Sequence, residues 1–352
     1  MAGSGSPCRA QCPTMAACEP CGNPPWRPKS IAYSTFVYGA LALWSAPNSN
    51  GPDSNSLESK RVATYFLGVD GGGTNCRIRL ADENLVTLAE AAGGRSNLQI
   101  EDGEPAYRSI MDGTREAFAK AGIDFAQTAD THACFGMAGG RLPSARTAFA
   151  ARDWPFAKVT VYDDIDIARA GAHGGEDGAV IIVGTGSAAM ALVDGHRHQA
   201  GGWGFHIGDQ MSGAILGREL VRRAVEATDG LVSGSPLTEA TVEALGGTLD
   251  AVMDWSFKDR RPADYGALMP MLMDYYEKGD PVARELIDLE MSYVDNYVAW
   301  FKARGATRMA AVGGFGTRLY PLMEHRYGDF IVRPQREPLH GAVILARQNV
   351  SA

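Results

Sequence analysis

Two glycine-rich turns, each set between strand-like runs, constrain the fold of this chain more than any other feature. The first turn, Gly71–Thr74, follows the apolar run Tyr65–Asp70, and an alternating apolar and polar run follows it. The second turn, Gly184–Ser187, follows the apolar run 179–183 and is followed by another. In both places a polar turn then leads into a third strand. This repeat predicts a duplicated α/β fold with a cleft between its halves.

The two turns are suited to holding phosphate. Glycine makes up 42 of the 352 residues, well above the usual level of about 7%. Successive backbone N–H groups in such a turn can point at one anion, and Thr74, Thr185 or Ser187 adds a hydroxyl. The sequence contains no GxxxxGK[ST] motif, so a phosphate loop that opens a helix is excluded. A single GGG could merely make a tight turn, but two equivalent turns favour phosphate binding.

The remaining elements alternate between helices and strands before a mainly helical region. We expect strands at 131–137, 159–162, 309–312 and 330–332. We expect helices at 104–121, 142–151, 210–228, 237–244, 263–277, 280–303 and 341–348, with another beginning at 165–170.

Residues 1–61 differ from the rest of the chain. They hold eight of the 18 prolines and show no helical or strand period, so we expect a disordered leader. Cys8, Cys12, Cys18 and Cys21 could form a zinc site, but their spacing does not match the usual paired layout. The apolar run Ile31–Ala46 is short for a membrane span and has the wrong upstream region for a signal peptide.

Charge and cysteine content are typical of an ordinary soluble globular protein. The formal net charge is −8 and no basic stripe is present, so we expect no nucleic-acid partner. Cys76 and Cys134 lie in strand-like runs, and we expect them to pack in the core as small apolar residues. We expect both thiols to stay reduced in the cytoplasm. We expect an N-terminal α/β domain at 62–178 and a C-terminal α/β domain with a helical insertion at 179–352.

These motifs resemble the actin-like ATPase superfamily of sugar kinases, specifically its glucosamine and N-acetylglucosamine kinase branch, which is of the BadF/BadG/BcrA/BcrD type. The resemblance covers nearly all of 62–350. The family pattern GxDGGGT matches Gly68–Thr74, and GTGS matches Gly184–Ser187. The resemblance implies a duplicated actin-like (ribonuclease H-like) fold with a central cleft. It also implies that Asp70 holds Mg²⁺ and that both turns contact the phosphates of ATP.

The resemblance also implies a catalytic aspartate. The family pattern [NTD]DxxxA fits Asp163–Ala168 and assigns the role to Asp164. A sugar kinase needs a carboxylate that accepts the proton of the attacking hydroxyl. The alternative is that Asp163, Asp164 and Asp166 only cap a helix.

A third matching segment indicates the acceptor. The family loop GGWGxxxGDEGS matches Gly201–Ser212, except that Gln210 replaces a glutamate and Met211 a glycine. The glucosamine branch tends to have Asp-Gln at this point. We expect Asp209 to stabilise an ammonium group and Met211 to narrow the acceptor site. Asn97 matches a substrate-contacting asparagine, although it could also be a turn residue.

The resemblance implies three groups of binding residues. For the ATP phosphates they are Gly71, Gly72, Gly73, Thr74, Asn75, Gly184, Thr185, Gly186 and Ser187. For the adenosine they are Gly313, Gly314, Phe315 and Gly316. For the sugar they are Asn97, Gly139, Gly202, Trp203, Asp209 and Gln210.

The leading hypothesis is an ATP-dependent hexosamine kinase that phosphorylates the 6-hydroxyl of glucosamine, with N-acetylglucosamine as the alternative substrate. Two further alternatives are an ATPase activator of a 2-hydroxyacyl-CoA dehydratase and a non-catalytic sugar-sensing protein. The expected partners are ATP, Mg²⁺ and an amino sugar, without membrane or nucleic acid. We expect a cytoplasmic homodimer.

Overall fold

The computed structural model of this protein describes residues 64–350. The expected leader at 1–61 and its four cysteines lie outside the described residues. Within residues 64–350, none of the helices is long and apolar enough to span a membrane.

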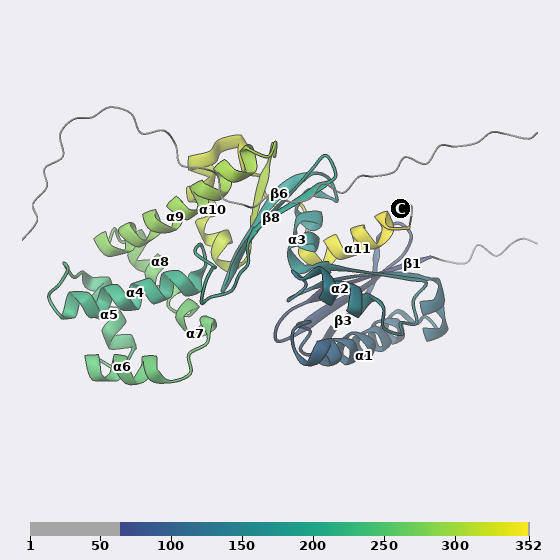
Figure 1. Cartoon of the computed structure of the whole chain (residues 1–352), viewed down its shortest axis with the longest axis horizontal. Coiled ribbons are helices and arrows are strands. Elements are labelled where there is room, and N and C mark those ends of the chain that lie inside the picture. The colour runs from purple at the N-terminus through teal and green to yellow at the C-terminus, as the bar shows by residue number, and fades with distance from the viewer. Residues whose placement is uncertain (1–63, 351–352) are drawn as a thin grey trace, which may run out of the picture. The chain divides into compact units, whose positions relative to one another are not determined.

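Two mixed sheets form the framework of the described chain (Figure 1). The first has the strand order β3-β2-β1-β4-β5 and the second has the order β8-β7-β6-β9. The strands of the first sheet are β1 (Tyr65–Gly71), β2 (Cys76–Ala81), β3 (Thr87–Gly93), β4 (Thr131–Met137) and β5 (Lys158–Asp163). Those of the second are β6 (Gly178–Val183), β7 (Ser187–Val193), β8 (His196–Gly201) and β9 (Met309–Val312).

The two sheets repeat one topology, as the two glycine turns predict. Strands β1, β2 and β3 form an antiparallel meander, and β4 then pairs with β1 in parallel. Strands β6, β7 and β8 repeat the meander, and β9 pairs with β6 in parallel. The counterpart of β5 is reduced to a single parallel bridge between Met309 and Ile331. The strand expected at 330–332 is therefore wrong.

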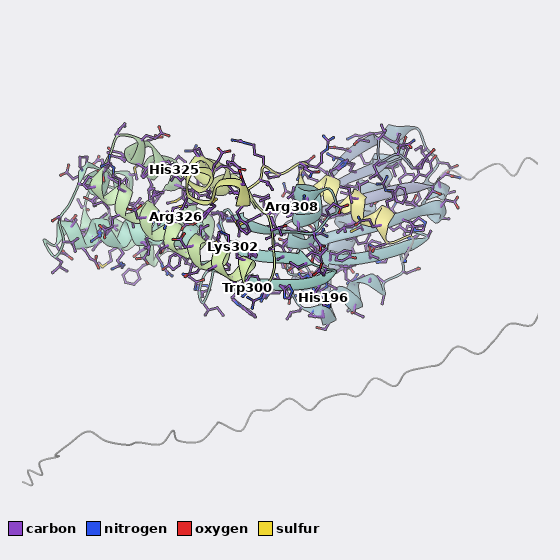
Figure 2. All side chains as sticks on the ribbon, turned by 90° about the horizontal axis from the view of Figure 1, so that it is seen from above. His196, Trp300, Lys302, Arg308, His325 and Arg326 are labelled. Carbon is purple, nitrogen blue, oxygen red and sulfur yellow. The ribbon has the colours of Figure 1, made fainter. Side chains whose placement is uncertain are left out.

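Helices α1 (Glu104–Ala121) and α2 (Pro143–Ala150) pack on the first sheet. The helical region contains α4 (Gly213–Thr228), α5 (Pro236–Ala244), α6 (Leu249–Phe257), α7 (Pro262–Gly266), α8 (Met269–Glu277), α9 (Pro281–Lys302) and α10 (Gly314–Tyr327). Short 3₁₀ turns occur at Glu101–Gly103, Phe125–Asp130 and Gly328–Phe330. Figure 2 labels Trp300 and Lys302 near the end of α9.

The helical region departs from the sequence-based expectation at three points. The single helix expected at 263–277 is divided into α7 and α8, because Pro270 occupies the first turn of a new helix. Helix α6 was not expected. Helix α10 was also not expected, since its glycine-rich start was interpreted only as a turn.

Helices α3 (Asp164–His173) and α11 (Pro338–Gln348) pack against each other, and both contact the first sheet (Figure 1). They approach through glycines: a Cβ on Gly341 would lie 2.0 Å from the carbonyl oxygen of Ile167. A Cβ on Gly171 would lie 2.4 Å from the carbonyl oxygen of Glu337. The last helix of the range 179–352 therefore packs on the first sheet, which sequence alone did not indicate. The division into 62–178 and 179–352 stays a prediction.

The buried apolar residues form one cluster beneath the first sheet and a larger one among the helices of the second half. A third cluster joins α3 and α11 to β1 and β4. Cys76 and Cys134 are free and buried, as expected. Burial raises the pKa of the Cys76 thiol to about 11 and that of Cys134 further, so both remain protonated.

Candidate active site

The three acidic residues at the start of α3 have different surroundings. Asp163 ends β5, and its Oδ2 accepts a hydrogen bond of 2.8 Å from Gln199 Nε2. Asp166 caps the helix by accepting from the Asp163 backbone N–H, and Arg197 binds its two carboxylate oxygens at 2.6 and 2.9 Å. Asp164 is bound by neither Gln199 nor Arg197, and its carboxyl group interacts instead with the neighbouring carboxyl group of Asp163. The helix-capping alternative therefore accounts for Asp163 and Asp166 and leaves Asp164 free for another role.

Asp164 faces a cavity of about 350 Å³, which we call the Asp164 cavity. Its lining residues are Gly139, Arg141, Asp163, Asp164, Ile182, Gly184, Thr185, Gly186, Ser187, Ala188, Gln199, Gly202, Gly204 and Asp209. Burial and the neighbouring carboxylates of Asp163 and Asp70 raise the pKa of Asp164 to about 8. In its ionised form, which becomes populated as the pH approaches 8, such a carboxylate is a stronger proton acceptor than an ordinary one.

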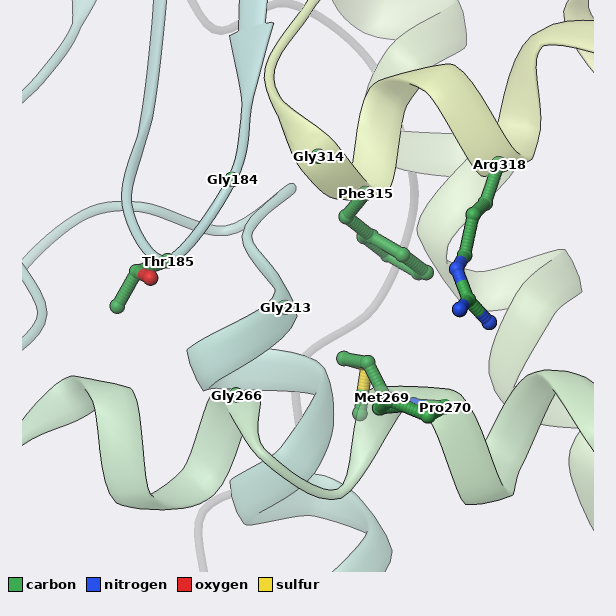
Figure 3. A pocket seen from close by; sticks show the side chains of 9 residues that line it. All are labelled: Gly184, Thr185, Gly213, Gly266, Met269, Pro270, Gly314, Phe315 and Arg318. Carbon is green, nitrogen blue, oxygen red and sulfur yellow. The ribbon is translucent and has the colours of Figure 1, made fainter.

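A second cavity, of about 340 Å³, lies at the start of α10, and we call it the Phe315 cavity. Figure 3 shows Phe315 and Arg318 from α10 beside Met269 and Pro270 from α8. Phe315 is buried and supplies an aromatic face, while glycines of the surrounding turns leave room next to it. A planar ring system fits such an environment.

The second glycine turn separates these two cavities. Gly184 and Thr185 line both of them. The turn is held by a hydrogen bond of 2.8 Å from the Gly213 backbone N–H to the Gly184 carbonyl oxygen. The Ser187 Oγ is buried and has no hydrogen-bond partner among the described residues. An unsatisfied hydroxyl next to a glycine turn suits an anionic ligand.

The first glycine turn is more exposed and lines neither cavity. A Cβ on Gly73 would meet open space, so the backbone there is accessible. The turn is held from behind by Ser96, which is fully buried. The Ser96 Oγ donates to the Gly72 carbonyl oxygen at 2.9 Å and to that of Asn75 at 3.3 Å. Sequence reasoning missed Ser96, although it stands next to the expected sugar-binding residue Asn97.

Asp70 lies near the end of β1 within a chain of ion pairs. Arg77 binds Asp70 Oδ2 at 2.7 Å and Glu337 at 2.6 Å, and Arg79 binds Glu337 at 2.5 Å. Burial opposes ionisation of Glu337, but the hydrogen bonds from Arg79 and Arg77 hold its pKa below the usual value. Glu337 is the N-cap of α11, so this chain joins that helix to the strand that carries Asp70.

The carboxylate of Asp70 fits one ligand of a Mg²⁺ ion. Its charge is close enough to raise the pKa of Asp164, so the two acids lie in one region. Within residues 64–350, no group of three or more His, Cys, Asp or Glu side chains could hold a metal by itself. Mg²⁺ is commonly held by one or two carboxylates together with substrate phosphates.

Three of the expected sugar-binding residues line the Asp164 cavity: Gly139, Gly202 and Asp209. Asp209 has a left-handed backbone, with φ of 59°, and burial raises the pKa of its carboxyl above the usual range. Asn97 lies directly beside Gly139, since a Cβ on that glycine would lie 2.4 Å from Asn97 Oδ1. The same oxygen accepts from the Gln99 backbone N–H at 2.8 Å, which is the turn role considered above.

The other residues of the matched loop lie elsewhere. Gln210 is exposed and is not among the lining residues. Met211 is fully buried in the hydrophobic cluster of the helical region. The expectation that Met211 narrows the acceptor site is therefore wrong, because its side chain packs into the core and does not line the cavity. Trp203 is also absent from the lining, but its ring stacks on Arg141, which does line the cavity.

The expected adenosine turn opens α10. Gly314 and Phe315 line the Phe315 cavity, whereas Gly316 packs against Val183. Gly313 has φ of 96°, and a Cβ there would lie 2.6 Å from the Val183 carbonyl oxygen. Only glycine fits this close approach between β9 and the second glycine turn.

Sequence comparison connects this arrangement with known proteins. Residues 67–346 match the BadF/BadG/BcrA/BcrD ATPase family. The chain belongs to this family. It is 32% identical over 282 residues to the glucosamine kinase GspK of Vibrio cholerae, a match that covers 80% of this chain and 95% of the relative.

Solved structures agree with the family. A protein from Chromobacterium violaceum, provisionally assigned as an N-acetylglucosamine kinase, is 31% identical with a TM-score of 0.72, covering 82% of this chain and 100% of that one. A ROK family glucokinase from Streptomyces griseus, in complex with glucose and AMPPNP, is 18% identical with a TM-score of 0.51, covering 82% and 100%. The duplicated actin-like α/β class expected from the sequence is thereby confirmed.

Proposed function

We propose that this member of the BadF/BadG/BcrA/BcrD ATPase family is an ATP-dependent hexosamine kinase that transfers phosphate to the 6-hydroxyl of glucosamine. The observation that carries the proposal is the position of the second glycine turn between two cavities. One cavity has an aromatic wall and the other has the carboxyl group of Asp164, and Gly184 and Thr185 line both. A phosphate chain held at this turn would extend from a nucleoside on one side to an acceptor on the other.

In this proposal Phe315, Gly313, Gly314 and Gly316 form the adenosine site. The phosphates are held by Thr185 and the backbone of the two glycine turns, with Asp70 as the magnesium ligand. When bound, the metal neutralises charge on the phosphoryl oxygens. Backbone N–H groups and the Ser187 hydroxyl add fixed dipoles that need no reorganisation during the reaction.

Asp164 is the proposed proton acceptor. Its carboxylate faces the cavity that would hold the sugar, and the two acids beside it are bound to Gln199 and Arg197. As the 6-hydroxyl attacks the γ-phosphoryl group, Asp164 takes its proton. The leaving oxygen stays with ADP, and the sugar carries away the phosphoryl group. Positioning and charge stabilisation supply most of the catalysis in such a transfer.

Two observations support glucosamine over N-acetylglucosamine. The first is the similarity to GspK. The second is Asp209, a buried carboxylate in the Asp164 cavity that could pair with an ammonium group. N-acetylglucosamine is the alternative substrate, because the chain is also similar to the Chromobacterium violaceum protein.

Sugar-dependent release of ADP tests the proposal. Purified full-length protein would be assayed with glucosamine, N-acetylglucosamine, N-acetylmannosamine and glucose. We expect glucosamine to exceed N-acetylglucosamine in kcat/KM by at least about tenfold, which corresponds to about 1.4 kcal/mol of transition-state binding. The reverse order would assign N-acetylglucosamine as the substrate. No turnover with either hexosamine would refute the kinase assignment.

A further inference from the structure

Arg141 is a cavity residue to which the motifs assign no role. It follows β4 and lines the Asp164 cavity together with Gly139. Its backbone is fixed by Arg146 of α2, which donates hydrogen bonds to the carbonyl oxygens of Gly140 and Arg141 at 2.5 and 3.3 Å. The guanidinium therefore projects from a segment with a defined position.

The Nη1 of Arg141 is buried and has no hydrogen-bond partner among residues 64–350. It lies near the backbone of Gly202, where a Cβ would be 3.8 Å away. A buried donor without a partner costs free energy unless a ligand or water supplies an oxygen. Because this nitrogen belongs to a residue that lines the cavity, an oxygen of the acceptor could satisfy it.

The guanidinium is held in place by Trp203. Its central carbon lies 3.9 Å from the centroid of the Trp203 ring, which is close for a cation–π pair. Trp203 is 60% exposed, so its side chain covers one side of the guanidinium without being part of the core. Arg141 follows β4 of the first sheet, whereas Trp203 follows β8 of the second sheet. The pair therefore joins segments from both sheets at the cavity.

The charges around Arg141 favour a donor role. Burial and the charge of Arg197 lower the pKa of the guanidinium, while Asp163 raises it. Asp163 already accepts from Gln199 and does not occupy Nη1. Arg141 thus remains a cation whose Nη1 is bound to no carboxylate of the described residues, which leaves this donor available to a ligand.

We propose that Arg141, oriented by the Trp203 ring, binds the acceptor by donating from Nη1 to an oxygen of the hexosamine. The inference rests on the proposed function and names a recognition residue for the acceptor. The cavity would then bind its substrate between the Arg141 guanidinium and the Asp209 carboxylate, both of which line it. This assignment also gives Trp203 a role in sugar binding although its ring does not line the cavity.

The test compares Arg141→Ala, Arg141→Lys and Trp203→Leu in steady-state kinetics, with sugar and ATP varied separately. We expect Arg141→Ala to raise the KM for the hexosamine at least about tenfold while the KM for ATP stays within about twofold. Arg141→Lys should recover part of the affinity, since it restores the charge but not the planar fork. Trp203→Leu should raise the sugar KM by less than Arg141→Ala does, since it removes only the platform.

Arg304 and Trp300 supply a matched control. The Arg304 guanidinium lies 3.9 Å from the Trp300 ring centroid, the same distance as in the Arg141–Trp203 pair, and neither residue lines the two cavities. Arg304→Ala should therefore leave both KM values unchanged. If Arg141→Ala changed both KM values equally, or lowered only kcat, the acceptor-binding role would be refuted.

Calorimetric titration of sugar into the protein without ATP separates this inference from the proposed function. We expect wild type to bind the hexosamine and Arg141→Ala to bind it at least about tenfold more weakly. Equal binding by both proteins would overturn the role of Arg141 even if the kinase activity is confirmed. Sugar binding that depends on Arg141 in a protein without kinase activity would support Arg141 and refute only the kinase assignment.

Discussion

Replacing Glu290 with glutamine should stabilise the protein, and increasingly so as the pH rises. Glu290 lies on α9 with no exposed surface, and neither carboxylate oxygen has a hydrogen-bond partner among the described residues. Burial raises the pKa of this carboxyl to about 8, so the folded chain holds a proton that the unfolded chain releases near pH 4.5. Stability is therefore lost as the pH rises from about 4.5 towards 8 and levels off above that.

The size of the effect follows from the pKa difference. Between pH 4.5 and 8 the unfolded chain gains free energy by ionising Glu290, while the folded chain keeps the proton. At about 1.4 kcal/mol for each pH unit, this lowers the free energy of unfolding by on the order of 3 to 5 kcal/mol at pH 8. Glutamine keeps the shape and removes the ionisation, so Glu290→Gln should match wild type near pH 5 and melt several degrees higher at pH 8.

Thermal unfolding followed by circular dichroism between pH 5 and 9 measures the difference in melting temperature. Glu285→Gln on the same helix is the matched control, because the Glu285 side chain is 62% exposed. Its difference from wild type should not grow with pH. A melting difference for Glu290→Gln that is constant from pH 5 to 8, or that favours wild type at pH 8, would refute the reasoning.

Three further variants separate nucleotide binding from sugar binding. Asp70→Asn should raise the KM for ATP at least about tenfold with little change in sugar affinity, because it removes a hard ligand for Mg²⁺; an equal loss of both would indicate unfolding instead. Ser96→Ala should raise the KM for ATP about fivefold, as expected for about 1 kcal/mol from a lost hydrogen bond to the first glycine turn. Thr114→Ala, which removes another fully buried hydroxyl bonded to a backbone carbonyl, should not raise it. Phe315→Ala should weaken nucleotide binding at least about tenfold in a titration without sugar; unchanged binding would exclude the Phe315 cavity as the adenosine site.

The local pattern of the chain predicted most of the first sheet and its helices. The strand expected at 131–137 and the helix expected at 104–121 have the observed bounds, because a clear period and a proline in the first turn define them. The two glycine turns predicted the duplication, which the sheet topology repeats strand by strand. Short-range signals sufficed in these places.

Features that depend on distant parts of the chain were not predictable from local patterns. Helix α10 begins at Gly314 and contains Pro321, both of which disfavour a helix locally, yet Phe315 and Leu319 are buried in the core. Met211 stands in a loop motif but packs into the helical cluster. Only the folded chain brings Arg141 next to Trp203, since no spacing in the sequence connects them.

The candidate site was predictable where a motif carries chemistry. Asp164 faces its cavity, and the glycine turn at Gly184 lies where two cavities meet. The residues that hold these groups in place, such as Ser96 and Gln199, form ordinary hydrogen bonds and have no signature of their own. The roles of these residues can be assigned only once the folded structure shows which groups they bind.

The rate and sugar affinity of Asp164→Asn test the central claim most directly. The account predicts that kcat for hexosamine phosphorylation falls about 10²- to 10⁴-fold, because the proton acceptor is removed. Calorimetry should show sugar and nucleotide binding within about threefold of wild type, since the amide keeps the shape of the side chain. A variant that retained a third or more of the wild-type rate would contradict the account, because Asp164 could then not be the group that accepts the proton.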